Sequence, residues 1–259
     1  MITPVRPVAI VTGARRGIGR GCGEALARAG FDIAATDLVL DEASGAAQSA
    51  FAMAGADAAF FANDISDIDS HAGLVDAVMA RFGRIDCVVN NAGRGAVVRG
   101  GDMLDLKPEN YDIVMSVNLR GTLFLTQALA KAMIARGETG HPRSIIMIGS
   151  ASAEMASPDR ADYCVSKAGL SMAMRNFAVR LAPEGIAVFE VRPGIIRTEL
   201  TAPVAKGYDE RIANGLVPAG RWGEPADVGD VVAGLASGKF HFATGSVIHV
   251  DGGLLIPRL

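Results

Sequence analysis

The sequence has little charge, few aromatic residues and few cysteines. Only 20% of its 259 residues are charged and 5% are aromatic, whereas 50% are hydrophobic. This composition excludes a disordered or nucleic-acid-binding tail and predicts a large buried core. The net charge of −3 and the pI near 5.8 provide no positive field for nucleic acid or for an anionic membrane surface. We therefore expect no nucleic acid and no membrane as partners.

The three cysteines, Cys22, Cys87 and Cys164, lie far apart and form no CxxC pair. Isolated thiols of this kind are typical of a reducing compartment. The N-terminal segment lacks the charged start, apolar middle and cleavage site of a signal peptide. Charges interrupt the apolar stretches, which argues against a membrane span. The sequence thus predicts a cytoplasmic protein.

Short apolar runs alternate with amphipathic helical segments along the whole chain. Seven runs are typical of strands buried on both faces of a parallel sheet: residues 8–12, 31–37, 57–63, 85–91, 144–149, 186–193 and 246–252. Helical spacing occurs between them, for example at residues 17–29, 67–82, 109–136, 162–182 and 225–236. The alternation predicts the α/β fold class: a single doubly wound Rossmann domain over residues 1–259, with a seven-stranded parallel sheet and helices on both faces.

A glycine-rich turn, TGARRGIG, follows the first strand. Glycines at a strand-to-helix turn let the backbone approach a pyrophosphate, whose charge meets the free N–H groups of the helix. The spacing is G-x-x-x-G-x-G rather than G-x-G-x-x-G, so a tight turn without a ligand is the alternative. The residues expected to contact a dinucleotide here are Gly13, Arg15, Arg16, Gly17, Ile18 and Gly19.

The second strand ends at Asp37, where a carboxylate accepts hydrogen bonds from the adenine ribose hydroxyls and repels a 2′-phosphate. Arg16 argues the other way, because a guanidinium pairs with a 2′-phosphate. The contact between Asp37 and a phosphate would be desolvated and therefore weighs more. We predict NAD as the cofactor, with NADP as the alternative. Asp64 and Ile65, after the third strand, are expected either to contact adenine or to begin the next helix.

Tyr163 and Lys167 stand one helical turn apart, on one face of a predicted helix. A phenol is a weak base at neutral pH, but a fixed cation beside it stabilises the phenolate. Ser150 ends the fifth strand, at the sheet edge where two hydroxyls can act on one carbonyl oxygen. Asn118 lies among apolar residues of a helix and needs a partner if buried, which a water linked to Lys167 would supply. The set predicts hydride transfer between a nicotinamide and a secondary alcohol or ketone.

With Asn90-Asn91-Ala92-Gly93 and Pro193-Gly194, these motifs follow the order of the short-chain dehydrogenase/reductase family, which the chain resembles over nearly its whole length. The resemblance implies that Tyr163 is the catalytic acid and base, assisted by Lys167, which also holds the nicotinamide ribose. It implies that Ser150 orients the carbonyl oxygen and that Asn118 supports a proton relay. Further cofactor contacts are implied at Asn91, Ala92, Gly93, Pro193, Gly194, Ile196 and Thr198. A homotetramer is also implied, with an interface of the helices around 109–136 and 162–182.

The chain resembles 3-oxoacyl-(acyl-carrier-protein) reductases and the sugar, polyol and alcohol dehydrogenases built like them. The substrate pocket is expected between residues 94–103, 151–160 and 194–222, the last of which predicts a mobile lid. Glu154 and Asp159 there argue against a strongly anionic ligand.

Asp37 favours an NAD-dependent enzyme with a sugar, polyol, hydroxy acid or 3-oxoacyl type of small-molecule substrate. The alternative is a 3-oxoacyl-(acyl-carrier-protein) reductase of fatty-acid synthesis that uses NADPH. A dinucleotide sensor and a methyltransferase are remote alternatives, because neither needs the pair Tyr163 and Lys167. The four histidines show neither i, i+4 pairing nor carboxylate neighbours, so no metal site is predicted.

Overall fold

Seven parallel strands form the sheet in the computed structural model, which describes residues 6–98 and 100–258. Their order is β3-β2-β1-β4-β5-β6-β7, and every pairing is parallel. The strands are β1 (Val8–Thr12), β2 (Asp32–Asp37), β3 (Ala58–Ala62), β4 (Cys87–Asn90), β5 (Arg143–Ile148), β6 (Ile186–Pro193) and β7 (Val247–Val250). The predicted doubly wound Rossmann fold with a seven-stranded parallel sheet is confirmed.

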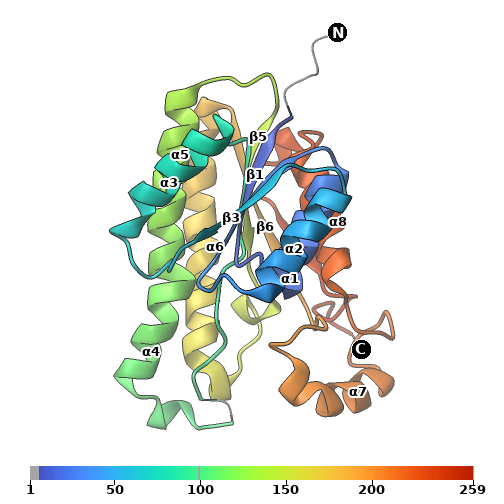
Figure 1. Cartoon of the computed structure of the whole chain (residues 1–259). Coiled ribbons are helices and arrows are strands. Elements are labelled where there is room, and N and C mark those ends of the chain that lie inside the picture. The colour runs from blue at the N-terminus through green and yellow to red at the C-terminus, as the bar shows by residue number, and fades with distance from the viewer. Residues whose placement is uncertain (1–5, 99, 259) are drawn as a thin grey trace.

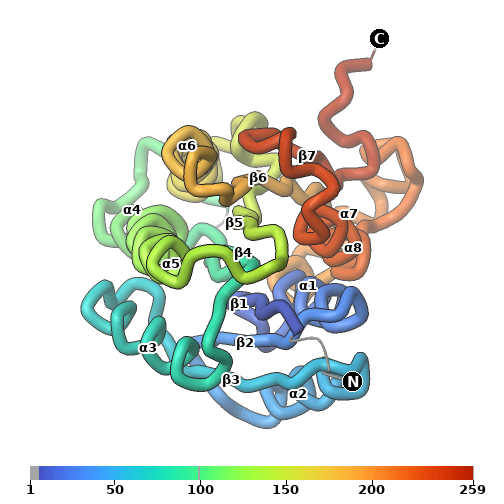
Figure 2. Tube along the Cα trace, turned by 90° about the horizontal axis from the view of Figure 1, so that it is seen from above, coloured from blue at the N-terminus to red at the C-terminus, as the bar shows by residue number. Residues whose placement is uncertain are grey.

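Helices cover both faces of the sheet. Viewed from above, α1, α2 and α8 lie on one side of the line of strands, and α3, α4, α5 and α6 lie on the other (Figure 2). The helices are α1 (Gly17–Arg28), α2 (Glu42–Met53), α3 (Ser70–Phe82), α4 (Pro108–Met115), α5 (Thr122–Arg136), α6 (Ala161–Leu181), α7 (Ala205–Ala213) and α8 (Pro225–Ala236). The sheet therefore has one apolar core on each face.

Successive side chains of one strand point into different cores. Val11 belongs to the core under α1 and α8, with Leu26 and Val228, whereas its neighbour Ile10 faces the core under α5 and α6, with Leu129. All five side chains are fully buried. Each such burial stabilises the fold by about 1.5–3 kcal/mol. Because both faces are covered, the strands lack the alternation of a half-exposed sheet, as their sequences indicate.

The helical segment predicted at 109–136 is interrupted by a π-helical turn, Ser116–Gly121. A Cβ on Gly121 would overlap the carbonyl group of Ile65, so the helix passes this loop at backbone contact. The hydroxyl of Thr122 donates to the carbonyl of Val117, five residues earlier, at 3.2 Å and adds a side-chain bond across the wide turn. The turn directs Asn118 into the interior.

The run Pro108–Arg136 is long and apolar enough to cross a membrane by length and composition, with a mean hydropathy of 1.2. Charges do interrupt the run, as expected, at Arg120 and Lys131, but they are too few to lower its mean hydropathy further. Leu125, Leu129 and Met133 on it are fully buried against the sheet. Core helices of this kind pass the same compositional test, and its place in the fold identifies it as one.

The carboxyl ends of the strands lead to the lower side of Figure 1, where α7 and the start of α4 lie. β1 pairs with β2 on one side and with β4 on the other, so the strand order reverses between β1 and β4. Ligands of open α/β sheets bind outside the carboxyl ends of the strands, beside such a reversal. The fold therefore directs attention to the loops after β1, β4, β5 and β6.

Candidate active site

The glycine-rich turn after β1 is fastened to the end of β4. The Thr12 hydroxyl oxygen accepts hydrogen bonds from the backbone N–H groups of Asn91 and Ala92, at 3.0 and 2.9 Å. The Asn91 amide donates to the carbonyls of Thr12 and Gly13, at 2.9 and 3.0 Å. Gly13 has a φ of +65°, and a Cβ on Gly19 would overlap the Gly13 carbonyl. Packing of the turn itself thus requires glycine here.

The N-terminus of α1 fits a phosphate group. Its N-cap residue, Arg16, makes no side-chain cap, and the first turn contains no acidic residue. The helix itself therefore places no anion at these N–H groups, but the Glu199 carboxylate lies near them, with Oε2 3.7 Å from the position of a Cβ on Gly17. Thr198 closes the other side, since its Cγ2 lies 3.4 Å from the position of a Cβ on Gly17.

Asp37, at the end of β2, faces the turn. Its Oδ2 accepts a hydrogen bond from the backbone N–H of Arg15 at 3.2 Å, and its Oδ1 accepts one from that of Leu38 at 2.9 Å. The Arg15 side chain lies between two carboxylates: Nε is 3.9 Å from Asp37 Oδ1, and Nη1 donates to Asp41. The side chain of Arg16 is exposed and forms no hydrogen bond or ion pair within residues 6–98 and 100–258.

Asp64 and Ile65 lie in the loop between β3 and α3. The Asp64 carboxylate accepts hydrogen bonds from the backbone N–H and the hydroxyl of Ser66, at 2.9 and 2.7 Å. Ile65 is buried, and its carbonyl accepts a hydrogen bond from the ring of His71 at 3.0 Å. Asp64 thus forms a turn ahead of α3, in line with the structural alternative. The adenine contact stays a prediction for both residues.

The Lys167 ammonium lies beside the Tyr163 ring, near the carboxyl ends of β4 and β5. Its buried Nζ donates to the carbonyl of Ile148, the last residue of β5, at 2.9 Å. The same Nζ lies 5.8 Å from the centre of the Tyr163 ring and 3.8 Å from the position of a Cβ on Gly93. The i, i+4 spacing does place the ammonium beside the phenol ring, at the carboxyl edge of the sheet.

Asn118 links the π-helical turn to the loop after β4 and to α6. Its Oδ1 accepts from the backbone N–H of Arg94, and its Nδ2 donates to the Arg94 carbonyl, both at 2.9 Å. Nδ2 also lies 3.1 Å from the hydroxyl of Ser166, which donates to the Tyr163 carbonyl at 2.7 Å. No sequence pattern pointed to Ser166, because a serine inside a helix is common. The expected water between Asn118 and Lys167 stays a prediction.

Ser150 follows β5 and begins a short 3₁₀ turn, Ala151–Ala153, that packs against α6. Its hydroxyl oxygen accepts a hydrogen bond from the backbone N–H of Ser152 at 3.1 Å. Within the described part of the chain, the Ser150 hydroxyl proton has no acceptor and the Tyr163 hydroxyl has no partner. Both half-buried hydroxyls retain hydrogen-bonding capacity for a ligand.

A buried ion pair, which the apolar pattern of residues 186–193 did not suggest, lies beneath this loop. Glu190 and Arg192 on β6 are joined at 2.6 Å, and Arg192 also donates to Glu154 and, at 2.7 Å, to the hydroxyl of Ser171. A Cβ on Gly149 would overlap the Glu190 carboxylate. Arg192 shares its charge between Glu190 and Glu154, and the three residues keep one net negative charge, so the repulsion of anionic ligands by Glu154 stays a prediction.

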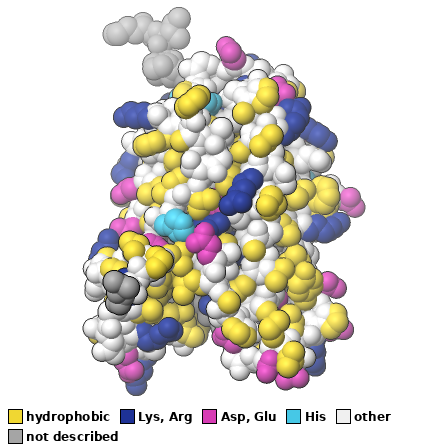
Figure 3. Space-filling view, turned by 180° about the vertical axis from the view of Figure 1, so that it is seen from behind, with side chains coloured by type: hydrophobic (Ala, Val, Ile, Leu, Met, Phe, Trp, Pro, Cys, Tyr) yellow, Lys and Arg dark blue, Asp and Glu magenta, His cyan; other side chains and the backbone are white. Residues whose placement is uncertain are grey.

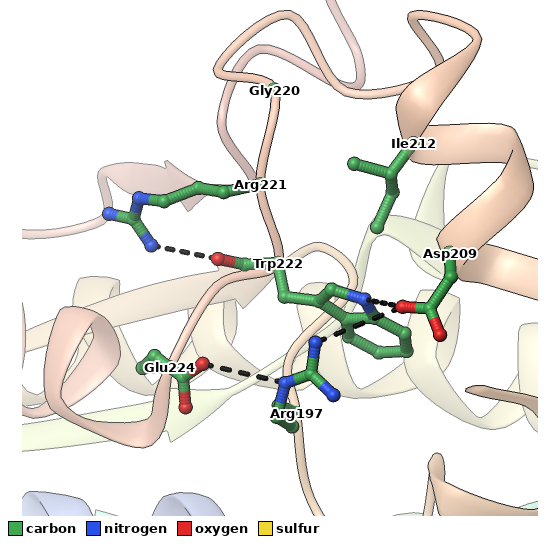
Figure 4. A pocket seen from close by; sticks show the side chains of 7 residues that line it. All are labelled: Arg197, Asp209, Ile212, Gly220, Arg221, Trp222 and Glu224. Atoms are coloured by element: carbon green, nitrogen blue, oxygen red, sulfur yellow. Dashed lines mark hydrogen bonds and ion pairs between the residues drawn. The ribbon is translucent and has the colours of Figure 1, made fainter. Parts of the chain in front are cut away.

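The segment 194–222 has a small core of its own around Trp222. The indole Nε1 donates to Asp209 of α7 at 2.7 Å, and the Arg197 guanidinium lies 4.7 Å from the ring centre (Figure 4). Arg197 also pairs with Asp209 at 3.8 Å and with Glu224 at 3.6 Å. Two cavities flank this tryptophan. α7 is therefore attached both by these polar contacts and by Ile212, which is buried together with Val217 and Trp222.

Residues 193–198 lead from β6 to the glycine-rich turn. The N–H of Gly194 donates to the Val250 carbonyl at 3.0 Å, and a Cβ on Gly194 would lie 2.7 Å from Asp251 Cα. Ile196 is buried.

The molecule is hollowed at its lower edge between the lobes around α7 and α4 (Figure 3). Residue 99, in the predicted pocket segment 94–103, lies outside the described residues.

Comparison with known proteins identifies relatives that match nearly the whole chain. The model of the family described as enoyl-(acyl carrier protein) reductase matches residues 13–255. A 3-oxoacyl-[acyl-carrier-protein] reductase from Thermotoga maritima is 32% identical over 249 residues, 96% of this chain and 98% of the relative. An L-rhamnose 1-dehydrogenase (NAD(P)(+)) from Azotobacter vinelandii is 36% identical over 251 residues, 95% of this chain and 96% of the relative. The crystal structure of a 3-oxoacyl-[acyl-carrier protein] reductase from Brucella melitensis in complex with NAD has a TM-score of 0.96 and 57% identity, and the match covers 99% of this chain and 100% of that one.

Proposed function

This chain belongs to the short-chain dehydrogenase/reductase family, as an NAD(P)-dependent oxidoreductase acting on CH–OH groups, and from that premise we propose that it uses NAD to interconvert a secondary alcohol and a ketone. The observation that carries the proposal is the place of Lys167 Nζ, 5.8 Å from the centre of the Tyr163 ring and bonded to the end of β5. A bound nicotinamide dinucleotide would supply the carbon that accepts or donates the hydride.

The protein's own side chains would move the proton. In alcohol oxidation the Tyr163 phenolate oxygen takes the proton of the substrate hydroxyl, and in carbonyl reduction the phenol returns it. The Lys167 ammonium favours the phenolate electrostatically. The free Ser150 hydroxyl proton would bond the same substrate oxygen. Asn118, held on both sides by the backbone of Arg94, would support the relay of protons toward Lys167.

The cofactor would follow the carboxyl edge of the sheet. The turn from Gly13 to Gly19 suits the pyrophosphate, because the first turn of α1 carries no competing cap. Asp37 would accept both hydroxyls of the adenine ribose, since each of its oxygens keeps acceptor capacity beside one backbone N–H. The segments 91–93 and 193–198 would enclose the nicotinamide. Arg16, exposed and unpaired in the described chain, supports NADP as the alternative.

The substrate is expected to be a small secondary alcohol or its ketone, such as a sugar, polyol or hydroxy acid, under a lid formed by 194–222. A 3-oxoacyl thioester is the second candidate. A Brucella protein described as a 3-oxoacyl-[acyl-carrier protein] reductase is 57% identical and was crystallised with NAD, so use of NAD does not by itself speak against this substrate.

We expect a cytoplasmic homotetramer. Val165, Met172 and Val179 form an apolar stripe on α6 at intervals of seven residues, and they are 49%, 54% and 79% exposed. A second copy would bury this stripe. The three free cysteines suit a reducing compartment. Light scattering coupled to size exclusion tests the assembly, and a monomer at micromolar concentration would contradict it.

Replacing Tyr163 with Phe tests the proposed reaction. The variant should lose activity by about 10²–10⁴-fold, because the proton donor is removed while the ring remains. NAD affinity should change little. Tyr111→Phe, in α4, is the matched control and should keep full activity. Activity is first sought with NAD and a panel of secondary alcohols, polyols and sugar acids, and with NADH and 3-oxoacyl thioesters. Full activity of Tyr163→Phe on the substrate found would refute the assignment.

A further inference from the structure

Arg15 is held in place by two carboxylates from different elements. Asp37 ends β2, and Asp41 begins α2 four residues later. The Arg15 Nη1 donates to Asp41, while Nε lies 3.9 Å from Asp37. The guanidinium is mostly shielded from water, with 17% of the Arg15 side chain exposed. Its positive charge is therefore shared between two negative charges.

Asp41 is fixed independently of this contact. Its Oδ1 accepts the backbone N–H groups of Ala43 and Ser44, at 3.0 and 3.3 Å, and its own N–H donates to the Ser44 hydroxyl at 2.7 Å. This capping box commits one carboxylate oxygen to α2 and leaves Oδ2 for Arg15. Desolvation raises the pKa of Asp41, but the Ser44 N–H and the Arg15 charge lower it more, so the pKa lies below its usual value. The carboxylate is charged wherever the enzyme would work.

We propose that Asp41 is a cofactor-specificity residue: by holding Arg15 against Asp37, it keeps this guanidinium from a 2′-phosphate and so supports the use of NAD. The inference rests on the proposed function, because it assumes a dinucleotide with its adenine ribose at Asp37. The sequence suggested only Asp37 and Arg16 as opposing groups.

Charge and geometry give this arrangement its effect. Arg15, Asp37 and Asp41 together carry one net negative charge next to the ribose site, which disfavours a phosphate. Within the described residues the Arg15 Nε is buried and makes no hydrogen bond. The guanidinium therefore has N–H donors without an acceptor. A phosphate could accept two parallel hydrogen bonds from it. Loss of the Asp41 charge would release Arg15 for that partner.

The test compares binding of 2′,5′-ADP and 5′-ADP by calorimetry in Asp41→Asn, Arg15→Gln and the double variant. Asparagine keeps the cap on α2, so the fold is retained. Asp41→Asn should bind 2′,5′-ADP about fivefold more tightly and 5′-ADP unchanged, and the gain should vanish when Arg15 is Gln. In the matched control, Asp41→Asn combined with Arg16→Gln, the gain should persist.

An unchanged preference in Asp41→Asn, or an equal gain without Arg15, would overturn the inference. Failure of the native protein to bind either 5′-ADP or NAD would instead refute the proposed function. The two failures are thus distinguished by the native protein alone.

Discussion

The two edges of the sheet use buried polar groups in opposite ways. At the amino-terminal edge Asp86 is fully buried, and its carboxylate accepts from Arg84 at 2.7 and 2.8 Å and from the backbone N–H of Val8 at 2.8 Å. Arg143 at the same edge donates to the carbonyls of Met133, Gly137 and Glu184. These charges are saturated by protein groups.

At the carboxyl edge three polar groups are only partly used, in contrast to the fully paired Arg192 beside them. The Lys167 ammonium, with three donors, makes a single hydrogen bond to protein among the described residues, and Ser150 and Tyr163 keep free hydroxyl protons. Saturated networks stabilise a fold, whereas positioned groups with spare capacity can bind a ligand. The comparison teaches that unused hydrogen-bonding capacity, more than burial or charge, separates the functional edge from the structural one.

The contrast is sharpest for Lys167→Met. Activity should fall by about 10²–10³-fold, because the phenolate loses its neighbouring cation. The free energy of unfolding should stay the same or rise, since a buried ammonium with one hydrogen bond is replaced by an apolar chain. Kinetics and urea unfolding measure both. A large loss of stability would show that Lys167 belongs with the saturated groups.

Asp86→Asn should produce the reverse pattern. Removing the carboxylate leaves the buried Arg84 guanidinium without a counter-charge, at a cost of about 3–5 kcal/mol in the free energy of unfolding. NAD affinity and kcat of the folded protein should be unchanged. Asp57→Asn is the control: its ion pair with Arg81 has about half of each side chain exposed, so the cost should stay below about 1 kcal/mol. A kcat defect in Asp86→Asn would break the separation of the two edges.

Ser166→Ala probes the boundary between the two kinds of group. It removes the hydrogen bond to Asn118 and should lower kcat about fivefold, at a cost near 1 kcal/mol in stability. The KM for NAD should not change. Ser49→Ala is the control: within the described residues this hydroxyl donates only to the Gly45 carbonyl in α2, so the variant should leave kcat unaltered. Equal kcat in both variants would mean that Asn118 needs no support from α6.

The smallest effect is expected from thiol labelling. Desolvation raises the pKa of Cys87 to about 12, and that of Cys22 still further from its usual value, so neither forms thiolate near pH 8. Half-exposed Cys164, one residue from Tyr163, should react with a disulfide reagent, with one thiol titrated per folded chain. Raising the pH to 9 should not expose a second thiol before unfolding. Two fast thiols would mean that the core opens locally.

Sequence periodicity was most reliable where local signals were strong. The limits of β1 and α8 were predicted to the residue, because a buried run ends at a glycine turn in one case and a proline begins the helix in the other. α2 was missed among the helical segments named from the sequence. It buries only Ser44, Ala47 and Phe51, and its start depends on the Asp41 cap more than on an apolar face.

The candidate site was predictable in its motifs but not in its supports. Tyr163 and Lys167 share a helix, so spacing alone brought them together. The hydrogen bond between Asn118 and Ser166 and the ion pair of Arg15 with Asp41 join segments far apart in sequence, which no periodicity encodes. Glu190 and Arg192 alternate with apolar residues on a strand that was predicted to be apolar on both faces, and only tertiary pairing makes them compatible with burial.

The π-helical turn at Ser116–Gly121 has a consequence for how this chain can change by insertion and deletion. Such a turn holds one residue more than a regular helix needs. Because each residue of an α-helix advances by about 100°, deleting one codon here would restore a regular helix and rotate Asn118 out of the interior. A length change of one residue, which a surface loop would tolerate, would at this point abolish the proposed proton relay.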